Sequence, residues 1–450
     1  MMKEKLGNLR LEPTQILVAG FAVVILVGAI LLNLPIASQD GRSIGFVNAL
    51  FTATSAVCVT GLVVVDTGTH WTVFGKTVIV ILIQVGGLGF MTMATMFAIL
   101  LGKKISLKER LIMQEALNQY SLEGIVRFTK YIIVGTFMIE GIGAFFLSFR
   151  FIPEYGWIKG ISYSIFHAIS AFCNAGFDII GEGRGLTPYV SDPIVNLTIG
   201  FLVIVGGIGF SVMVDLMNHK NLKRLSLHTK MVLFITALLL LIGFGGFLIL
   251  EWNNPETLGE LSVGGKLLGG FFQSMTTRTA GFNTIALDAM TNASKLLTIV
   301  LMYIGGSPAS TAGGIKTATL GVILFTVVSV IRGKEDTELF HRRIPRDIVN
   351  RAITVAVIGI TLIIVITMVL TITEAGTSFL DVLFEATSAF GTVGLSLGIT
   401  SELTIPGRMV IIFMMFSGRV GPLTIAYALA RQQRKNKGII KYPEGKIIVG

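Results

Sequence analysis

The sequence predicts an all-α integral membrane protein with eight transmembrane helices and four re-entrant pore loops around one central pore. Three observations support this fold class: an apolar composition, charge-free stretches long enough to span a bilayer, and a short segment that recurs four times. Of the 450 residues, 52% are hydrophobic and 14% are charged, which is too apolar for a single soluble core. The composition therefore excludes a soluble enzyme and a disordered chain.

Charge-free stretches mark the expected spans. Six stretches without Asp, Glu, Lys or Arg come near or exceed the roughly 20 residues that cross a hydrocarbon core as a helix. They are residues 13–39, 77–102, 193–214, 231–250, 296–315 and 352–373. The first stretch is too long for the apolar part of a secretion signal and lacks a small-residue cleavage pattern before Leu32. We therefore expect it to be a retained span.

One short segment recurs along the chain. Its four copies read NALFTATSAVCVTGL (48–62), YSIFHAISAFCNAGF (163–177), GGFFQSMTTRTAGFN (269–283) and DVLFEATSAFGTVGL (381–395). Each copy carries a glycine ten residues after a phenylalanine: Phe51 and Gly61, Phe166 and Gly176, Phe271 and Gly281, Phe384 and Gly394. Its helix-compatible part is too short to cross a bilayer. The segment must enter and return, which is tolerated only around a shared aqueous path or inside protein.

The recurring segments divide the chain into four repeats and a tail. Each repeat has an apolar span before the short segment and another after it. The expected repeats are residues 13–101, 126–217, 228–331 (with a broken second helix) and 350–431, and the tail is 432–450.

The placement of positive charge predicts the orientation. The net charge is +10, and 25 of the 36 Lys and Arg residues lie in 1–12, 102–130, 218–230, 332–351 and after 430. The connectors on the other side carry 8 basic against 14 acidic residues. By the positive-inside rule both termini are cytoplasmic, and the acidic outer face would concentrate cations. The basic balance thus favours a membrane and not nucleic acid.

The end of each short segment has the chemistry of a cation filter. Rings of backbone carbonyls can replace the water of an alkali cation, and glycine permits the backbone angles that aim them. The negative end of each short helix would also face the pore centre. The predicted filter residues are Cys58, Val59, Thr60 and Gly61; Cys173, Asn174, Ala175 and Gly176; Arg278, Thr279, Ala280 and Gly281; and Gly391, Thr392, Val393 and Gly394.

These segments belong to a recognisable pattern. Together with QVGGLGFMT (84–92), GGSPASTAGGIKT (305–317) and GRVGPLT (418–424), they resemble the Trk/Ktr/HKT superfamily of potassium transporters over nearly the whole chain. The resemblance looks closest to the membrane subunit of bacterial Ktr systems. It implies four M1-P-M2 repeats with one filter glycine each, K⁺ bound at the filter carbonyls, no enzyme activity and no covalent cofactor. Cys58 departs from the pattern, which has Thr there.

The resemblance also implies a gate. An intramembrane loop below the filter would consist of Gly305, Gly306, Ser307, Pro308, Ala309, Ser310, Thr311, Ala312, Gly313 and Gly314. These residues are poor helix formers with polar groups that need partners at that depth. A tightly packed kink at Pro308 is the alternative. The related stretches GGLGF (86–90) and GGIGF (206–210) are expected to be close-packing glycines within helices.

Three basic residues fall at membrane depth. Arg419 interrupts an apolar stretch, where a charge is expensive and by default faces a cavity or a partner. In the family an Arg here faces the pore below the filter, as a pore charge or a tether for the gate. A pair with Glu140 is the alternative. We expect Arg278 to turn away from the ion path toward loop carbonyls, and Lys316 to be a buried charge beside the gate.

The resemblance finally implies partners. It indicates a homodimer in the bacterial plasma membrane, on a cytoplasmic ring of nucleotide-binding (RCK-type) subunits, with Na⁺ as a candidate activator. The basic inner loops and the tail would dock the ring, although solvated loops explain the same charges. A secondary carrier of another small solute is the rival function. An intramembrane enzyme is disfavoured, since the five histidines lack metal-ligand spacing.

Overall fold

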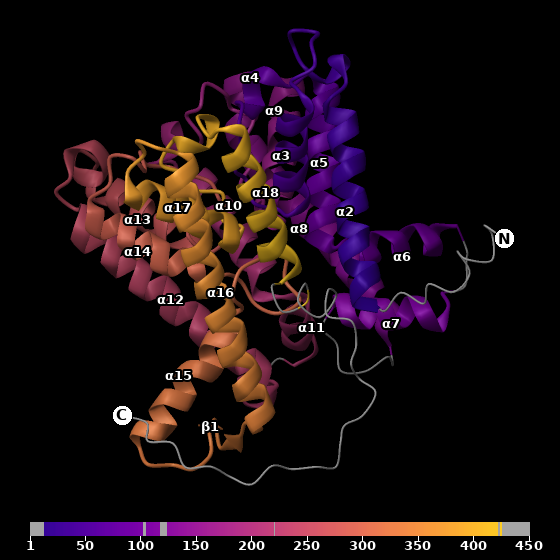
Figure 1. Ribbon diagram of the computed structural model, residues 1–450, viewed down its shortest axis with the longest axis vertical. Helices are drawn as coiled ribbons and strands as arrows, with labels where there is room; N and C mark the ends of the chain where they lie inside the picture. The colour runs from indigo at the N-terminus through magenta and orange to yellow at the C-terminus, as the bar shows by residue number, and fades with distance from the viewer. Residues whose placement is uncertain (1–12, 102–104, 118–123, 220, 422–423, 425–450) are drawn as a thin grey trace.

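Four long helices form the framework of the protein (Figure 1). The computed structural model describes residues 13–101, 105–117, 124–219, 221–421 and 424, so the predicted tail 432–450 lies outside the described residues. The helices long and apolar enough to cross a membrane are α2 (Pro13–Leu32), α8 (Ile125–Tyr155), α12 (Leu227–Glu251) and α16 (Arg346–Thr373). Exposed apolar side chains line them, for example Val134 and Phe145 on α8. Such a surface is compatible with lipid and not with water.

A shorter helix follows each long one. These four short helices are α3 (Phe46–Val57), α9 (Trp157–Phe172), α13 (Val263–Thr276) and α17 (Phe379–Gly391). Their C-terminal halves are buried and consist of Ala, Ser, Thr, Phe and similar residues. Each packs against the long helix that precedes it. The arrangement brings the ends of all four short helices into the interior of the molecule.

A third group of helices follows the loops after the short helices. It comprises α5 (Val73–Leu88), α10 (Pro193–Ile208), α14 (Asn292–Tyr303) and α18 (Ile405–Val420). The chain after Tyr303 is not helical until α15 (Thr317–Ile331), which is the interruption that the sequence predicts. Counting α5 and α10 with their continuations gives six candidate spans. The count of eight stays a prediction, because α14, α15 and α18 have only 12, 15 and 16 residues.

The helices α5 and α10 are sharply bent. α5 turns by 100° into α6 (Phe90–Leu100), and α10 turns by 95° into α11 (Phe210–Asn218). The prediction of glycines within helices is confirmed for Gly86, Gly87, Gly206 and Gly207. It is wrong for Gly89 and Gly209, whose φ of +83° and +94° ends a right-handed helix. The expected close packing is present: a Cβ on Gly86 or Gly206 would press on the last residue of α3 or α9.

Polar side chains join the ends of neighbouring helices. Glu251 accepts hydrogen bonds from the backbone N–H (3.0 Å) and the hydroxyl (2.9 Å) of Thr291, which caps α14. Glu374 accepts from the N–H (3.0 Å) and hydroxyl (2.6 Å) of Thr404, which caps α18. A carboxylate thus holds the end of a long helix against the start of the helix that follows the loop.

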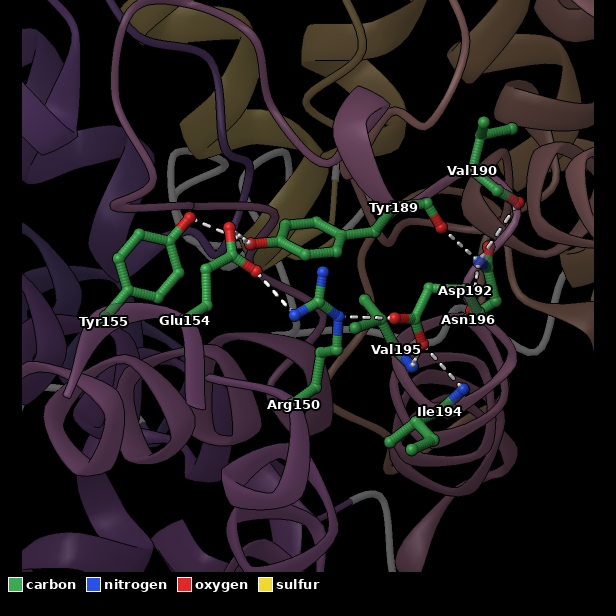
Figure 2. A network of polar contacts seen from close by, with 9 residues as sticks. All are labelled: Arg150, Glu154, Tyr155, Tyr189, Val190, Asp192, Ile194, Val195 and Asn196. Carbon is green, nitrogen blue, oxygen red and sulfur yellow. Dashed lines mark hydrogen bonds and ion pairs between the residues drawn. The ribbon is translucent and has the colours of Figure 1, made fainter. Parts of the chain in front are cut away.

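Figure 2 shows the corresponding junction between α8 and α10. Arg150 on α8 forms ion pairs with Glu154 (2.8 Å) and with Asp192 (2.7 Å), and Asp192 caps α10. Its guanidinium lies over the ring of Tyr189, 5.2 Å from the centroid, and Tyr189 donates to Glu154 (2.9 Å). Asn196 donates to the carbonyl of Tyr189 (2.7 Å). The network fixes the segment that leads from the outer loop into α10.

The remaining elements lie at the periphery. In Figure 1, α15 and the first part of α16 extend away from the rest together with a hairpin, at the end opposite α4 (Thr67–His70). The hairpin pairs β1 (Glu338–Leu339) with β2 (Arg342–Arg343), and Glu338 lies opposite Arg343. The small elements are α7 (Leu107–Ala116), the 3-10 helices η1 (Pro35–Ala37), η2 (Thr187–Tyr189), η3 (Leu222–Arg224) and η5 (Ile399–Ser401), and the π-helix η4 (Pro255–Gly259).

Candidate ion-binding site

The loops after the four short helices meet in a closed ring. Their glycines Gly61, Gly176, Gly281 and Gly394 have φ of +94°, +69°, +79° and +90°. A Cβ added to each would meet a backbone carbonyl of the next loop: Ala175 for Gly61 (2.5 Å), Ala280 for Gly176 (2.8 Å), Val393 for Gly281 (2.5 Å) and Thr60 for Gly394. Only glycine therefore fits at these positions without strain and collision.

The backbone of each loop directs its amides back to its own helix. The residue two before each glycine has a positive φ as well: Val59 (51°), Asn174 (57°), Thr279 (64°) and Thr392 (50°). The N–H groups of Thr60, Ala175 and Val393 donate to the carbonyls of Ser55 (2.8 Å), Ser170 (2.8 Å) and Ser388 (2.9 Å). In the third loop Ala280 donates to Thr276 (3.0 Å). The amides are thus used within each segment, whereas carbonyl oxygens of each loop lie against the glycine of a neighbouring loop.

The ring opens into a cavity of about 590 Å³. Asp66, Asp178 and Asp288 line this cavity together with Arg184, whose charge is offset by an ion pair with Glu182 in the same loop. Burial and the nearby negative charge of Asp66 raise the pKa of Asp178 to about 6. The cavity therefore favours cations at the mouth of the ring.

The interruption between α14 and α15, residues 304–316, lies at the opposite end of the loops. A Cβ on Gly314 would lie 3.2 Å from the Cα of Gly391, and one on Gly313 would collide with Thr392. We call residues 304–316 the intramembrane loop. All ten residues of the predicted gate, 305–314, belong to it. The loop is therefore in contact with the inner end of the fourth filter loop.

Backbone hydrogen bonds hold the intramembrane loop in place. Ser307 donates its N–H to the carbonyl of Gly207 (2.9 Å), and Phe210 donates to the carbonyl of Ala309 (2.8 Å), so the loop is fixed to the bend between α10 and α11. Gly305 donates to Ile315 (2.9 Å), which closes the base of the loop. This is more than a kink at Pro308: the segment is a folded loop with its own contacts.

Arg419 connects three parts of the chain. Its guanidinium donates to the carbonyls of Thr311 in the intramembrane loop and of Gly86 and Gly87 near the end of α5. Glu140 instead accepts from Gln84 (3.3 Å), and no ion pair between the described residues joins it to Arg419. The alternative of an Arg419–Glu140 pair is therefore wrong. The contacts agree with a tether.

The other two basic residues also bind carbonyls. Lys316 donates its ammonium to the carbonyl of Ala312 (2.6 Å), within the intramembrane loop. Arg278 turns away from the ring as expected, but it donates to the carbonyl of Thr236 on α12 (3.2 Å) and not to a loop. The long side chain of Arg278 thus reaches the neighbouring helix. Cys58 is wholly buried at the end of α3.

Sequence reasoning missed two features of the site. Glu385 on α17 is wholly buried and accepts hydrogen bonds from Ser396 (2.7 Å) and Thr400 (2.5 Å), which line the cavity. An acidic residue in the middle of the apolar stretch VLFEATSAF (382–390) could have indicated it. The second feature is a hydrogen bond from the hydroxyl of Thr311 to the side chain of Asn174 (3.0 Å). No local sequence pattern predicts a contact between residues so far apart in the chain.

The long helices have apolar faces compatible with lipid, and they surround a ring of loops below an acidic cavity. This arrangement is typical of a helical membrane protein that transports small cations. Residues 8–439 match the TrkH family model, which is described as a cation transport protein. The chain belongs to this family of cation transport proteins.

Individual relatives match over nearly their whole length. The Ktr system potassium uptake protein B of Bacillus subtilis (strain 168) is 47% identical over 441 residues, which cover 98% of this chain and 97% of that protein. The potassium/sodium uptake protein NtpJ of Enterococcus hirae is 44% identical over 453 residues, 100% of both chains. The crystal structure of the potassium transporter TrkH from Vibrio parahaemolyticus has a TM-score of 0.72 at 17% identity, covering 94% of this chain and 86% of that one. This last match shows the shared fold.

Proposed function

We propose that this chain is the ion-conducting subunit of a bacterial potassium uptake system of the Ktr type. The observation that carries the proposal is the closed ring of four filter loops, whose glycines abut one another's carbonyls beneath the acidic cavity. The names of the relatives, potassium uptake protein B and the potassium/sodium uptake protein NtpJ, support K⁺ as the ion and keep Na⁺ as a candidate activator.

In this proposal K⁺ enters the cavity, loses water and binds carbonyl oxygens of the predicted filter residues. Carbonyls stabilise a cation without a fixed charge that would trap it. The filter is built by four M1-P-M2 repeats, residues 13–101, 126–217, 228–331 and 350–431, with eight spans in the plasma membrane. The chain has both termini in the cytoplasm, where its basic loops lie.

The intramembrane loop is the gate of the path. It contacts the inner end of the filter, and its small residues can rearrange at little cost because few side chains need repacking. Arg419 holds it closed through the carbonyl of Thr311. A homodimer on a cytoplasmic ring of nucleotide-binding subunits would move the loop through α15 and the hairpin that follows it. The name of a Ktr system protein supports such a partner.

Uptake of Rb⁺, a K⁺ substitute, into liposomes with the purified protein tests the proposal. Replacing Gly281 by Ser adds a side chain where a Cβ already meets the carbonyl of Val393 at 2.5 Å. We expect Gly281→Ser to abolish uptake or to shift it toward Na⁺. Gly264→Ser on α13 is the matched control, since a Cβ there has open space around it. Wild-type uptake and selectivity in Gly281→Ser would contradict the assignment of the ring as a filter. Uptake of an organic solute by the wild-type protein would favour the alternative function, a secondary carrier.

A further inference from the structure

The side chain of Asn174 connects two filter loops with the intramembrane loop. Asn174 is wholly buried in the second filter loop, with φ of 57°, a conformation that asparagine tolerates better than most residues. Its amide N–H donates to the hydroxyl of Thr279 in the third filter loop (3.4 Å). Its amide oxygen accepts from the hydroxyl of Thr311 in the intramembrane loop (3.0 Å). The corresponding residue of the first loop, Val59, has no group that could make such bonds.

Thr311 connects the intramembrane loop to several other parts of the site. Besides Asn174, its hydroxyl reaches the carbonyl of Phe172 at the end of α9 (3.2 Å). Its N–H donates to the carbonyl of Gly206 on α10 (3.3 Å), and its own carbonyl accepts from Arg419. Thr311 is wholly buried. Any displacement of the loop that breaks the Arg419 contact must therefore also change what Asn174 touches.

We propose that the Thr311–Asn174 hydrogen bond couples the gate to the filter, so that Asn174 is a specificity-determining residue whose position depends on the intramembrane loop. The inference rests on the proposed function, because it needs cations to pass the ring. When Thr311 leaves, the buried amide of Asn174 loses a partner and must reorient, since an unsatisfied buried polar group is unfavourable. Asn174 precedes the carbonyl ring by one residue, so its reorientation alters the inner end of the filter.

The coupling between the intramembrane loop and the filter acts both ways. If the position of the loop changes the filter, then by thermodynamic reciprocity the ion in the filter changes the position of the loop. A cation that fits the closed ring stabilises Asn174 in its present place and with it the closed loop. Selectivity and gating are then two readouts of the same contact.

Single and double variants test the coupling. Thr311→Val keeps the shape but removes the hydroxyl, and Asn174→Val installs the residue that the first filter loop has at this position. We expect each to lower the preference for Rb⁺ over Na⁺ in proteoliposome uptake by about threefold or more, the loss of one hydrogen bond. The double variant should lose no more than the larger single effect, because both changes remove the same contact.

Controls separate the contact from general damage. Thr311→Ser retains the hydroxyl and should retain the wild-type ion preference. Thr298→Val removes a buried hydroxyl that donates to Ser294 within α14 (2.8 Å), away from the loop, and should leave the preference unchanged. If Thr311→Val fails to assemble, Thr311→Ala removes the same hydroxyl with less bulk.

The outcomes distinguish this inference from the proposed function. A faster flux in Thr311→Val with an unchanged Rb⁺/Na⁺ preference overturns the coupling and leaves the gate intact. Additive losses in the double variant overturn it as well. Normal uptake and selectivity in Gly281→Ser would contradict the proposed filter, and with it the proposed function, independently of the results at Thr311. A loss of preference in both single variants, with no further loss in the double variant and with the wild-type preference restored by serine at 311, supports the coupling.

Discussion

Buried carboxylates hold the outer loops of this protein in place. Glu251 and Glu374 each bind the threonine that caps a following helix, and Glu385 binds two hydroxyls from the rim of the cavity. All three accept hydrogen bonds from hydroxyl or amide groups, which offsets the cost of burying a polar carboxyl group. At the residue scale these contacts determine the position of the loops that surround the cavity.

Glu385 gives a prediction at this scale. Glu385→Ala leaves the hydroxyls of Ser396 and Thr400 without their acceptor, which should reduce stability by about 1–3 kcal/mol and lower Rb⁺ uptake. Glu385→Gln keeps one acceptor of similar size and should be intermediate. The exposed Glu402→Gln, close by in the sequence, serves as control. Thermal unfolding in detergent and proteoliposome uptake are the measurements, and an Ala variant equal to wild type in both would refute the role.

At the scale of elements, the interrupted helix between α14 and α15 is the feature with the clearest consequence. Its loop is bonded to α10 and to the α10–α11 bend, to Arg419 on α18 and to the filter loops. Such a loop has many partners but little bulk, since it contains mostly Gly, Ser, Thr and Ala. We therefore expect that the loop can move with little change in the packing of the helices around it.

Removing the loop should open the path. We expect deletion of residues 307–313 to give a high cation flux that no longer depends on a regulatory subunit. The control is the wild-type protein without regulator, which should remain slow. A deleted but correctly assembled protein with equally slow flux in liposomes would place the gate elsewhere.

Variants of Arg419 distinguish two roles for this residue, a tether of the intramembrane loop and a charge that repels cations. Its guanidinium reaches carbonyls on two elements at once, which the ammonium of lysine cannot do with the same fork geometry. If Arg419 is a tether, Arg419→Lys and Arg419→Ala both raise flux. If it acts by charge alone, Arg419→Lys behaves like wild type and only Arg419→Ala is faster. The flux assay with purified variants decides between the two.

The hairpin between α15 and α16 offers a third prediction for an element. Arg342, Arg343 and Arg346 are exposed there, and their reversal to Glu should weaken co-purification of a cytoplasmic regulatory ring in a salt-dependent manner. Arg42→Glu, an exposed reversal in the connector between α2 and α3, is the control. Unchanged binding at low salt would show that the charges only mark the cytoplasmic side of the membrane.

The whole molecule has two distinct ends. α4 lies at one end, and α15 with the basic hairpin extends at the other (Figure 1). The acidic cavity is lined by Asp66 and Thr67 at the start of α4. The positive-inside rule predicts that the end with the basic hairpin faces the cytoplasm.

Orientation can be tested with introduced cysteines. The native Cys58 and Cys173 are wholly buried, so a polar thiol reagent should react only with new sites. We expect Ser43→Cys to be labelled from outside intact cells, and Lys334→Cys only after permeabilisation. A permeant reagent that labels both is the control. Labelling of Lys334→Cys from outside would reverse the predicted topology.

Features that depend on local composition could be predicted from the order of residues. Hydropathy located the long helices, the glycine spacing located the four loops that form the ring, and the density of Gly, Pro and Ser located the interruption after Tyr303. These are properties of contiguous residues, because helix formation and transfer into lipid depend mainly on the residues of one segment.

The contacts between those segments, in contrast, are seen only in the tertiary structure. Arg419 and Thr311 are 108 positions apart, and Asn174 and Thr311 are 137 apart, so no periodicity relates them. The bends at Gly89 and Gly209 were missed for the same reason: a glycine adopts a positive φ where its surroundings require it, and the same residue packs inside a helix elsewhere. The acceptor of Arg278 likewise depends on which helix lies beside the third loop. Contacts between distant segments follow from three-dimensional packing, which the order of residues alone does not specify.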